Sequence, residues 1–185
     1  MPRELMRPFP LLSRLSGTQI EAWGRQLMKE LGGDGAVARE TLQSYFPMWL
    51  KRSAKSLGLE PYVIEIADYE WSLYWAREIA PSGPLIRSRP DVLTFNPLAR
   101  ILRLEFDILE WAASGGAGVP RRGPNILALA GDVPLKATFE MAAVLDVLAE
   151  QPCGRDDLIE NLKREHGARD WSGVLDQLVG ARLIF

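Results

Sequence analysis

The side chains best suited to catalysis or metal binding are few and scattered along this sequence. It contains one histidine, His166, and one cysteine, Cys153, and these two cannot provide a nitrogen- or sulfur-rich metal site. Glu65, Asp68 and Glu70 lie close together on a predicted helix. No histidine is near them in the sequence, so a solvated face or a helix contact is favoured over an acid–base site. We therefore expect no catalytic residue and no metal or other cofactor in this chain.

The composition is that of an ordinary globular protein. Its 185 residues include 22 basic and 24 acidic side chains, a net charge of −2, which excludes a strongly basic nucleic-acid-binding domain. The single cysteine excludes an internal disulfide framework and is typical of a reducing compartment. Residues 1–10 contain Glu4 and three prolines where a signal peptide needs an apolar run. No stretch reaches about 18 uninterrupted apolar residues. These features predict a cytoplasmic protein with no membrane span.

The first part of the chain predicts a helical domain over residues 1–80. Apolar residues recur there at helical spacing. Pro47 predicts a break or kink between a helix over 37–46 and another over 48–57. Pro61 is expected to open a further helix that ends near Ile79. Four helices with short connections predict a small bundle.

The second part changes from helical spacing to alternation. Prolines and a glycine within residues 80–90 predict a linker, placed at 81–98. Residues 99–185 are then expected to form three strands followed by three helices. The strands are predicted at 102–108, 125–130 and 135–140, and the helices at 141–150, 156–166 and 170–179. The fold class is α+β: an N-terminal helical bundle followed by a winged-helix-like peptide-recognition domain.

This order of elements predicts a peptide-binding groove. If residues 135–140 form an edge strand, their outward N–H and C=O groups can pair with an extended peptide as an added strand. The third helix would supply apolar pockets for the side chains of that peptide. Equally open is that the apolar residues of this helix only close the core. The candidate peptide-binding residues are Leu135, Lys136, Ala137, Thr138, Phe139, Glu140, Trp171, Val174, Leu175 and Leu178.

A winged-helix DNA-binding transcriptional regulator is the alternative. Its last helix would read DNA, yet residues 170–179 contain Asp170 and Asp176 and neither lysine nor arginine. A reading helix without cations lacks both the attraction to phosphate and the commonest base contact. Peptide binding is therefore the favoured interpretation, and DNA binding remains the second one.

Several stretches resemble a known family. Residues 60–71, Glu-Pro-Tyr-Val-Ile-Glu-Ile-Ala-Asp-Tyr-Glu-Trp, are similar to a helix of the HvfC-like proteins labelled as putative DNA-binding. Residues 96–107, Asn-Pro-Leu-Ala-Arg-Ile-Leu-Arg-Leu-Glu-Phe-Asp, resemble the strand that follows in that family. Residues 144–151 and 178–183 also have counterparts there. The similarity covers roughly 45–185, and the short length looks nearest to the methanobactin-pathway members.

The resemblance implies a partner subunit rather than a catalyst. Such proteins pair with multinuclear non-haem iron oxidative (MNIO) enzymes, which modify cysteines of ribosomally made precursor peptides, in methanobactin to oxazolone and thioamide groups. The iron would belong to the partner enzyme of a hetero-oligomer. The leader of the precursor would add a strand at 135–140 and contact the third helix. Neither nucleic acid nor a membrane would be a partner. The N-terminal half would hold the enzyme, with Tyr62, Trp71 and Trp75 as the candidate interface residues.

Overall fold

The computed structural model describes residues 7–31, 39–79, 92–131 and 133–185. These residues form two compact units, each described here by itself. The first contains Met1–Tyr74 and Leu104–Pro124, and the second contains Trp75–Arg103 and Asn125–Phe185. The division differs from the predicted boundaries because residues 104–124 return to the N-terminal unit. Both helices and antiparallel sheet are present, which confirms the α+β class.

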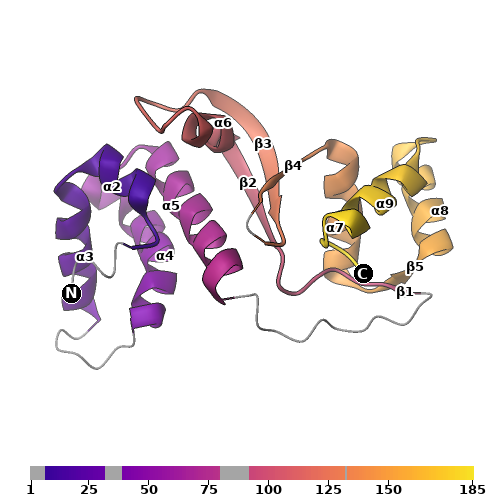
Figure 1. Ribbon diagram of the computed structural model, residues 1–185, viewed down its shortest axis with the longest axis horizontal. Helices are drawn as coiled ribbons and strands as arrows, with labels where there is room; N and C mark the ends of the chain where they lie inside the picture. Colours follow the sequence, from indigo (N-terminus) through magenta and orange to yellow (C-terminus); the bar gives the residue numbers. More distant parts are fainter. Residues whose placement is uncertain (1–6, 32–38, 80–91, 132) are drawn as a thin grey trace. The chain divides into compact units, whose positions relative to one another are not determined.

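The first unit is built mainly from helices (Figure 1), and aromatic side chains pack in its core. Phe9 and Phe46 lie with ring centroids 5.0 Å apart, and the ring of Trp49 stacks at 6.1 Å from Phe46. All three are fully buried, so an aromatic core holds this unit together. Its helices are α2 (Pro10–Ser16), α3 (Gln19–Glu30), α4 (Arg39–Leu57), α5 (Pro61–Tyr74) and α6 (Ile108–Ala113).

Helix α4 runs through Pro47, so the predicted break at this residue is wrong. A proline inside a helix costs one backbone hydrogen bond and strains the preceding turn. Phe46, Trp49 and Leu50 on both sides of it are each 0% exposed. Burial of these large side chains offsets the local cost and keeps the helix continuous.

The buried carboxylate of Glu70 on α5 fastens the start of α2. Its two oxygens accept the backbone N–H groups of Leu11, at 2.5 Å, and Leu12, at 2.9 Å. These N–H groups lie in the first turn of α2, where no helical carbonyl is available to them. Burial raises the pKa of Glu70 to about 7, while the two N–H donors and the nearby Arg14 act in the opposite direction.

The second unit combines two small sheets with three helices. Strands β2 (Arg100–Phe106) and β3 (Arg122–Leu129) start or end in this unit and are joined by β4 (Leu135–Ala137) in the order β2-β3-β4. The second sheet pairs β1 (Val92–Leu93) with β5 (Cys153–Gly154). The π-helical turn η1 (Trp75–Ile79) precedes them. The helices are α7 (Phe139–Glu150), α8 (Arg155–His166) and α9 (Trp171–Gly180).

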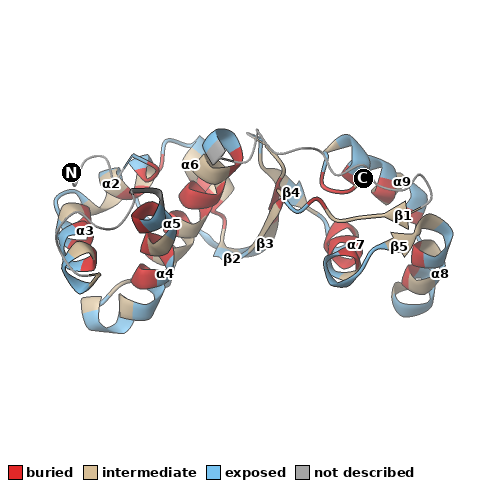
Figure 2. Ribbon diagram, turned by 90° about the horizontal axis from the view of Figure 1, so that it is seen from below, coloured by how far each residue is buried: buried red, intermediate tan, exposed pale blue. Residues whose placement is uncertain are grey.

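The core of the second unit lies among its helices. Figure 2 shows buried residues concentrated on α7, where Val144 and Leu145 are 0% exposed. They pack in one apolar cluster with Leu158 and Leu162 of α8 and with residues of α9. This burial is the main source of stability for the unit.

Two stretches differ from the predicted elements. Ile108, expected at the end of a strand, begins α6, because the Asp107 side chain accepts the Glu110 N–H and caps a new helix. The predicted linker is described only from Val92 onward. There, Thr94 and Phe185 exchange two backbone hydrogen bonds of 3.0 Å. Residues 92–98 therefore belong to the second unit, and residues 80–91 lie outside the described ones.

We expect the buried Glu70 to make stability depend on pH. Its folded-state pKa, about 7, lies above its ordinary value of 4.5, so the folded chain binds the extra proton between these values. The free energy of unfolding should therefore fall as pH rises from about 4.5 to about 7, by up to about 3 kcal/mol from this group. Urea denaturation across this range measures the dependence.

Glu70→Gln is the test variant, because it cannot ionise and still offers one acceptor. It should flatten the pH dependence, whereas the same change at the exposed Glu150 should leave it unaltered. The raised pKa of Glu70 would be contradicted if the free energy of unfolding of the wild type rose between pH 4.5 and 7 and Glu70→Gln abolished that rise.

Candidate functional site

Strand β4 is the outer strand of the three-stranded sheet. Its partner is β3, in a register that pairs Ile126 with Ala137, Leu127 with Lys136 and Ala128 with Leu135. No strand among the described residues lies on its other side. Successive residues of an antiparallel strand direct their N–H and C=O groups alternately toward the partner and away from it. The outer side of β4 therefore presents backbone groups to solvent or to an added strand.

The opposite edge of the sheet differs. At the end of β2, the N–H groups of Glu105 and Phe106 donate to the carboxylate of Glu65 on α5, at 2.8 and 3.1 Å. Glu65 thus occupies the backbone donors there, in place of another strand. Two of the acidic residues considered from the sequence, Glu65 and Glu70, therefore accept backbone N–H groups. Glu65 binds the end of β2, and Glu70 binds the start of α2.

Strand β4 is shorter than the segment predicted from alternation. Phe139 and Glu140, expected in the strand, are the first residues of α7. Thr138 is the N-cap, and its side-chain oxygen accepts the Met141 N–H at 3.3 Å. A threonine with its oxygen bonded three residues ahead stops the strand and starts the helix. The strand-addition segment is therefore reduced from six residues to Leu135–Ala137.

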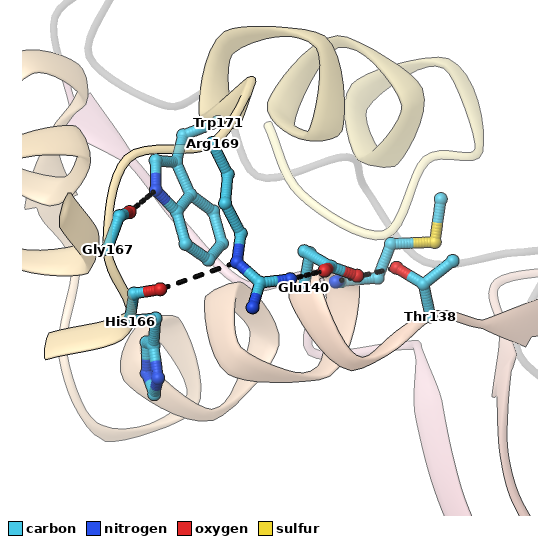
Figure 3. Close-up of polar contacts among 7 residues, drawn as sticks. Thr138, Glu140, His166, Gly167, Arg169 and Trp171 are labelled. Carbon is cyan, nitrogen blue, oxygen red and sulfur yellow. Dashed lines mark hydrogen bonds and ion pairs between the residues drawn. The ribbon is translucent and has the colours of Figure 1, made fainter.

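A network of polar contacts fixes the turn that leads from β4 into α7 (Figure 3). Arg169 forms an ion pair with Glu140 and donates to the carbonyl of His166. The backbone N–H of Glu140 itself, the Thr138 hydroxyl and then Arg169 lower the pKa of the Glu140 carboxyl. Trp171 Nε1 donates to the Gly167 carbonyl at 3.1 Å. These contacts join the turn between α8 and α9 to the start of α7.

An exposed aromatic ring lies on this network. Phe139 is 61% exposed, meets the His166 ring edge-on at 5.6 Å, and lies 6.0 Å from the Arg169 guanidinium carbon. It directly follows the Thr138 cap. The end of β4 therefore leads to an exposed aromatic surface rather than into the core.

The start of β4 borders a pocket of about 380 Å³. Its walls come from three parts of the second unit: the end of β3, the turn into β4 with the first residue of β4, and the end of α9. The described lining residues are Ala128, Ala130, Gly131, Val133, Pro134, Leu135, Gly180, Ala181, Arg182 and Leu183. Strand β4 and helix α9 therefore border the same pocket, but α9 does so only at its C-terminal end.

The predicted helix residues lie elsewhere. Trp171, Leu175 and Leu178 are 1%, 0% and 0% exposed and belong to the apolar cluster of the second unit. Val174 is half-buried and packs against the same cluster. These four side chains therefore lie in or against the core of the second unit, and none of them is among the described residues that line the pocket. Gly180, Ala181 and Arg182 line it instead.

Arg182 has an unusual backbone and was not singled out from the sequence. Its φ is +57°, the left-handed region, which costs an L-residue roughly 1–2 kcal/mol. The buried Asn96 holds it there: Asn96 Nδ2 donates to the Arg182 carbonyl at 2.7 Å, and Asn96 Oδ1 accepts the Leu98 N–H. The only available signal was the Asn-Pro pair that opens the second stretch of family resemblance.

The three candidate interface aromatics take different positions. Tyr62 is half-buried and lies edge-on to Phe106 at 5.8 Å. Trp71 is only 6% exposed and lies between Phe9 and Tyr74 in the core of the first unit. The half-buried Trp75 has the Arg100 guanidinium 4.4 Å from its ring centre. Trp71 therefore has a structural role, and Tyr62 and Trp75 keep partly accessible rings.

In the described part of the chain, no three His, Cys, Asp or Glu side chains gather in a way that could hold a metal ion. None of its helices combines the length and apolar character that a bilayer span requires. Cys153 is a half-buried free thiol in β5.

No protein-family model matches this sequence, and no curated protein matches it either. The arrangement around β4 therefore has to be interpreted from its own geometry.

We expect Arg182→Gly to stabilise the fold, because glycine adopts positive φ without a steric penalty. The free energy of unfolding in urea should rise by about 1 kcal/mol over wild type. Arg182→Ala is the matched control, since it removes the same side chain but retains the strained backbone. Equal stability of the glycine and alanine variants would contradict the strain at this position.

Proposed function

We propose that this chain is a non-catalytic adaptor that binds an extended segment of a ribosomally made precursor peptide by strand addition to β4 and presents it to an MNIO enzyme. The peptide would lie along the outer side of β4, between the pocket at Leu135 and the exposed ring of Phe139. In this proposal the second unit is a winged-helix-like recognition domain, with β2, β3 and β4 as its strands and α7, α8 and α9 as its helices. The iron would be carried by the enzyme.

The single observation that carries the proposal is the position of β4. It is the outer strand of its sheet among the described residues, and a pocket lies beside its first residue. An added strand gains main-chain hydrogen bonds from such an edge and side-chain selectivity from a pocket beside it. At the other edge of the sheet, Glu65 already occupies the donors of Glu105 and Phe106. This difference favours β4 as the binding edge.

The geometry favours a peptide over DNA. On α9, Asp170 accepts the Gly173 N–H as the N-cap, and the exposed Asp176 pairs with Arg155 of α8 at 2.8 Å. Arg155 is directed to this carboxylate and to the Ser172 carbonyl. A duplex would have to displace this ion pair before the cation could reach a phosphate.

Strand addition predicts a period-two response of the peptide backbone. Phage-displayed random 12-residue peptides are selected on the chain, and the best binder is synthesised with one N-methyl group at each position in turn. N-methylation removes one N–H donor, so alternate positions should lower affinity in calorimetric titration by about tenfold or more, and intervening positions much less. Amide exchange of Leu135–Ala137 should slow when the unmethylated peptide binds.

The intervening positions are the matched controls, because the protein is the same in every titration. A uniform response along the peptide, or unchanged amide exchange in β4 at saturation, would overturn the strand-addition site. Binding that falls steeply with added salt and occurs with duplex DNA instead would support the alternative, a DNA-binding regulator.

The partner role has a separate test. When the chain is co-expressed with an MNIO enzyme, the two should co-purify, and iron should follow the enzyme by elemental analysis. Removing the indole ring with Trp75→Ala should weaken co-purification if this half-buried ring contributes to the interface. Glu150→Gln serves as a surface control. Complete absence of a complex for the wild-type chain would overturn the partner assignment.

A further inference from the structure

The pocket beside β4 contains one cationic side chain. Arg182 is exposed and lines it, and the other described lining residues are alanine, glycine, valine, proline and leucine. None of these described residues carries a carboxylate. Asp132 lies outside the described residues. A cavity lined by apolar residues and one arginine is complementary to an apolar side chain next to an acidic one.

The position of this arginine is held at a cost. A residue just past a helix end with φ of +57° would be unstrained as glycine. The chain instead has arginine, and the buried Asn96 bonds its carbonyl. Strained non-glycine residues that the surroundings hold in place are typical of binding sites. The backbone strain therefore suggests that the Arg182 side chain itself has a role that glycine could not fill.

Arg182 and β4 belong to one site. Leu135, the first residue of β4, lines the same pocket as Arg182, and both lie in the second unit. An extended segment paired with the outer side of β4 passes this pocket at one end. Side chains that lie two residues apart along it share one face.

We infer that Arg182 is a specificity-determining residue that selects an acidic side chain in the segment bound at β4. This inference rests on the proposed function and goes beyond it by naming a chemical feature of the bound peptide. The guanidinium would pair with an aspartate or glutamate of the peptide, while β4 pairs with its backbone. Precursor segments with lysine or arginine at that position would be rejected by repulsion between like charges.

The test is a parallel selection from the displayed 12-residue library on the wild-type chain and on Arg182→Glu, with every peptide position read by sequencing. Wild type should enrich acidic residues at one position, and Arg182→Glu should enrich lysine or arginine there instead. Synthetic peptides that differ only at this position, Glu against Lys, should differ in affinity for wild type by about fivefold, the size that a partly exposed ion pair supports. The order should invert for the variant.

Two controls isolate the side chain. Arg182→Gln removes the charge and should bind both peptides alike, and Lys163→Glu makes the same reversal on the exposed face of α8 without altering the preference. Added salt should shrink the wild-type preference. Circular dichroism melts confirm that each variant is folded.

The possible results separate the inference from the proposed function. If peptides bind with the period-two N-methyl response but show no acidic preference, or one that Arg182→Glu leaves unchanged, the inference about Arg182 is wrong and the adaptor proposal stands. If no selected peptide protects β4 from amide exchange, the adaptor proposal is wrong and the inference falls with it. A preference that inverts supports both.

Discussion

Backbone hydrogen bonding at the outer side of β4 is the constraint on which the candidate site depends. The strand is hydrogen-bonded on one side to β3, and no strand among the described residues pairs with its other side. The Thr138 cap and the Glu140–Arg169 ion pair hold the start of α7, which directly follows this strand.

Carboxylates bonded to backbone N–H groups recur in the N-terminal unit. Glu70 accepts two N–H groups at the start of α2, and Glu65 accepts two at the end of β2. Each satisfies donors that helices and strands leave open at their ends. The burial of Glu70 carries an electrostatic penalty that Glu65, which is less buried, does not share to the same extent. Glu65 and Glu70 of α5 therefore connect this helix to the end of β2 and the start of α2.

Selectivity at the sheet edge has to come from more than the strand itself. Edge strands are commonly kept from indiscriminate pairing by short length and by lysine, and β4 has both: three residues, with Lys136 in the middle. Three residues provide few main-chain hydrogen bonds. In the proposed peptide complex, additional binding energy would come from the ends of the strand, where the pocket lies at Leu135 and the exposed Phe139 ring follows Thr138. Arg182, which lines this pocket, would add charge to the proposed recognition.

The sequence by itself determined the α+β class, because period-two and helical spacing are local properties of the chain. The predicted order of three strands and then three helices did not anticipate α6 between β2 and β3, or the short strands β1 and β5. The sequence-based prediction failed where distant contacts decide the outcome. Helix α4 continues through Pro47 because Phe46, Trp49 and Leu50 are buried in the core. Likewise, the apolar residues of α9 predicted a groove, but whether they face a cavity or the core depends on how α7 and α8 pack.

The pocket could not be predicted from sequence patterns, because contacts between distant residues form it. Its walls join residues 128–135 to residues 180–183, and the conformation of Arg182 depends on Asn96, 86 positions earlier in the chain. No periodicity links such positions. Only tertiary packing brings the last turn of α9 beside the first residue of β4, because burial of the shared apolar core fixes where that helix ends.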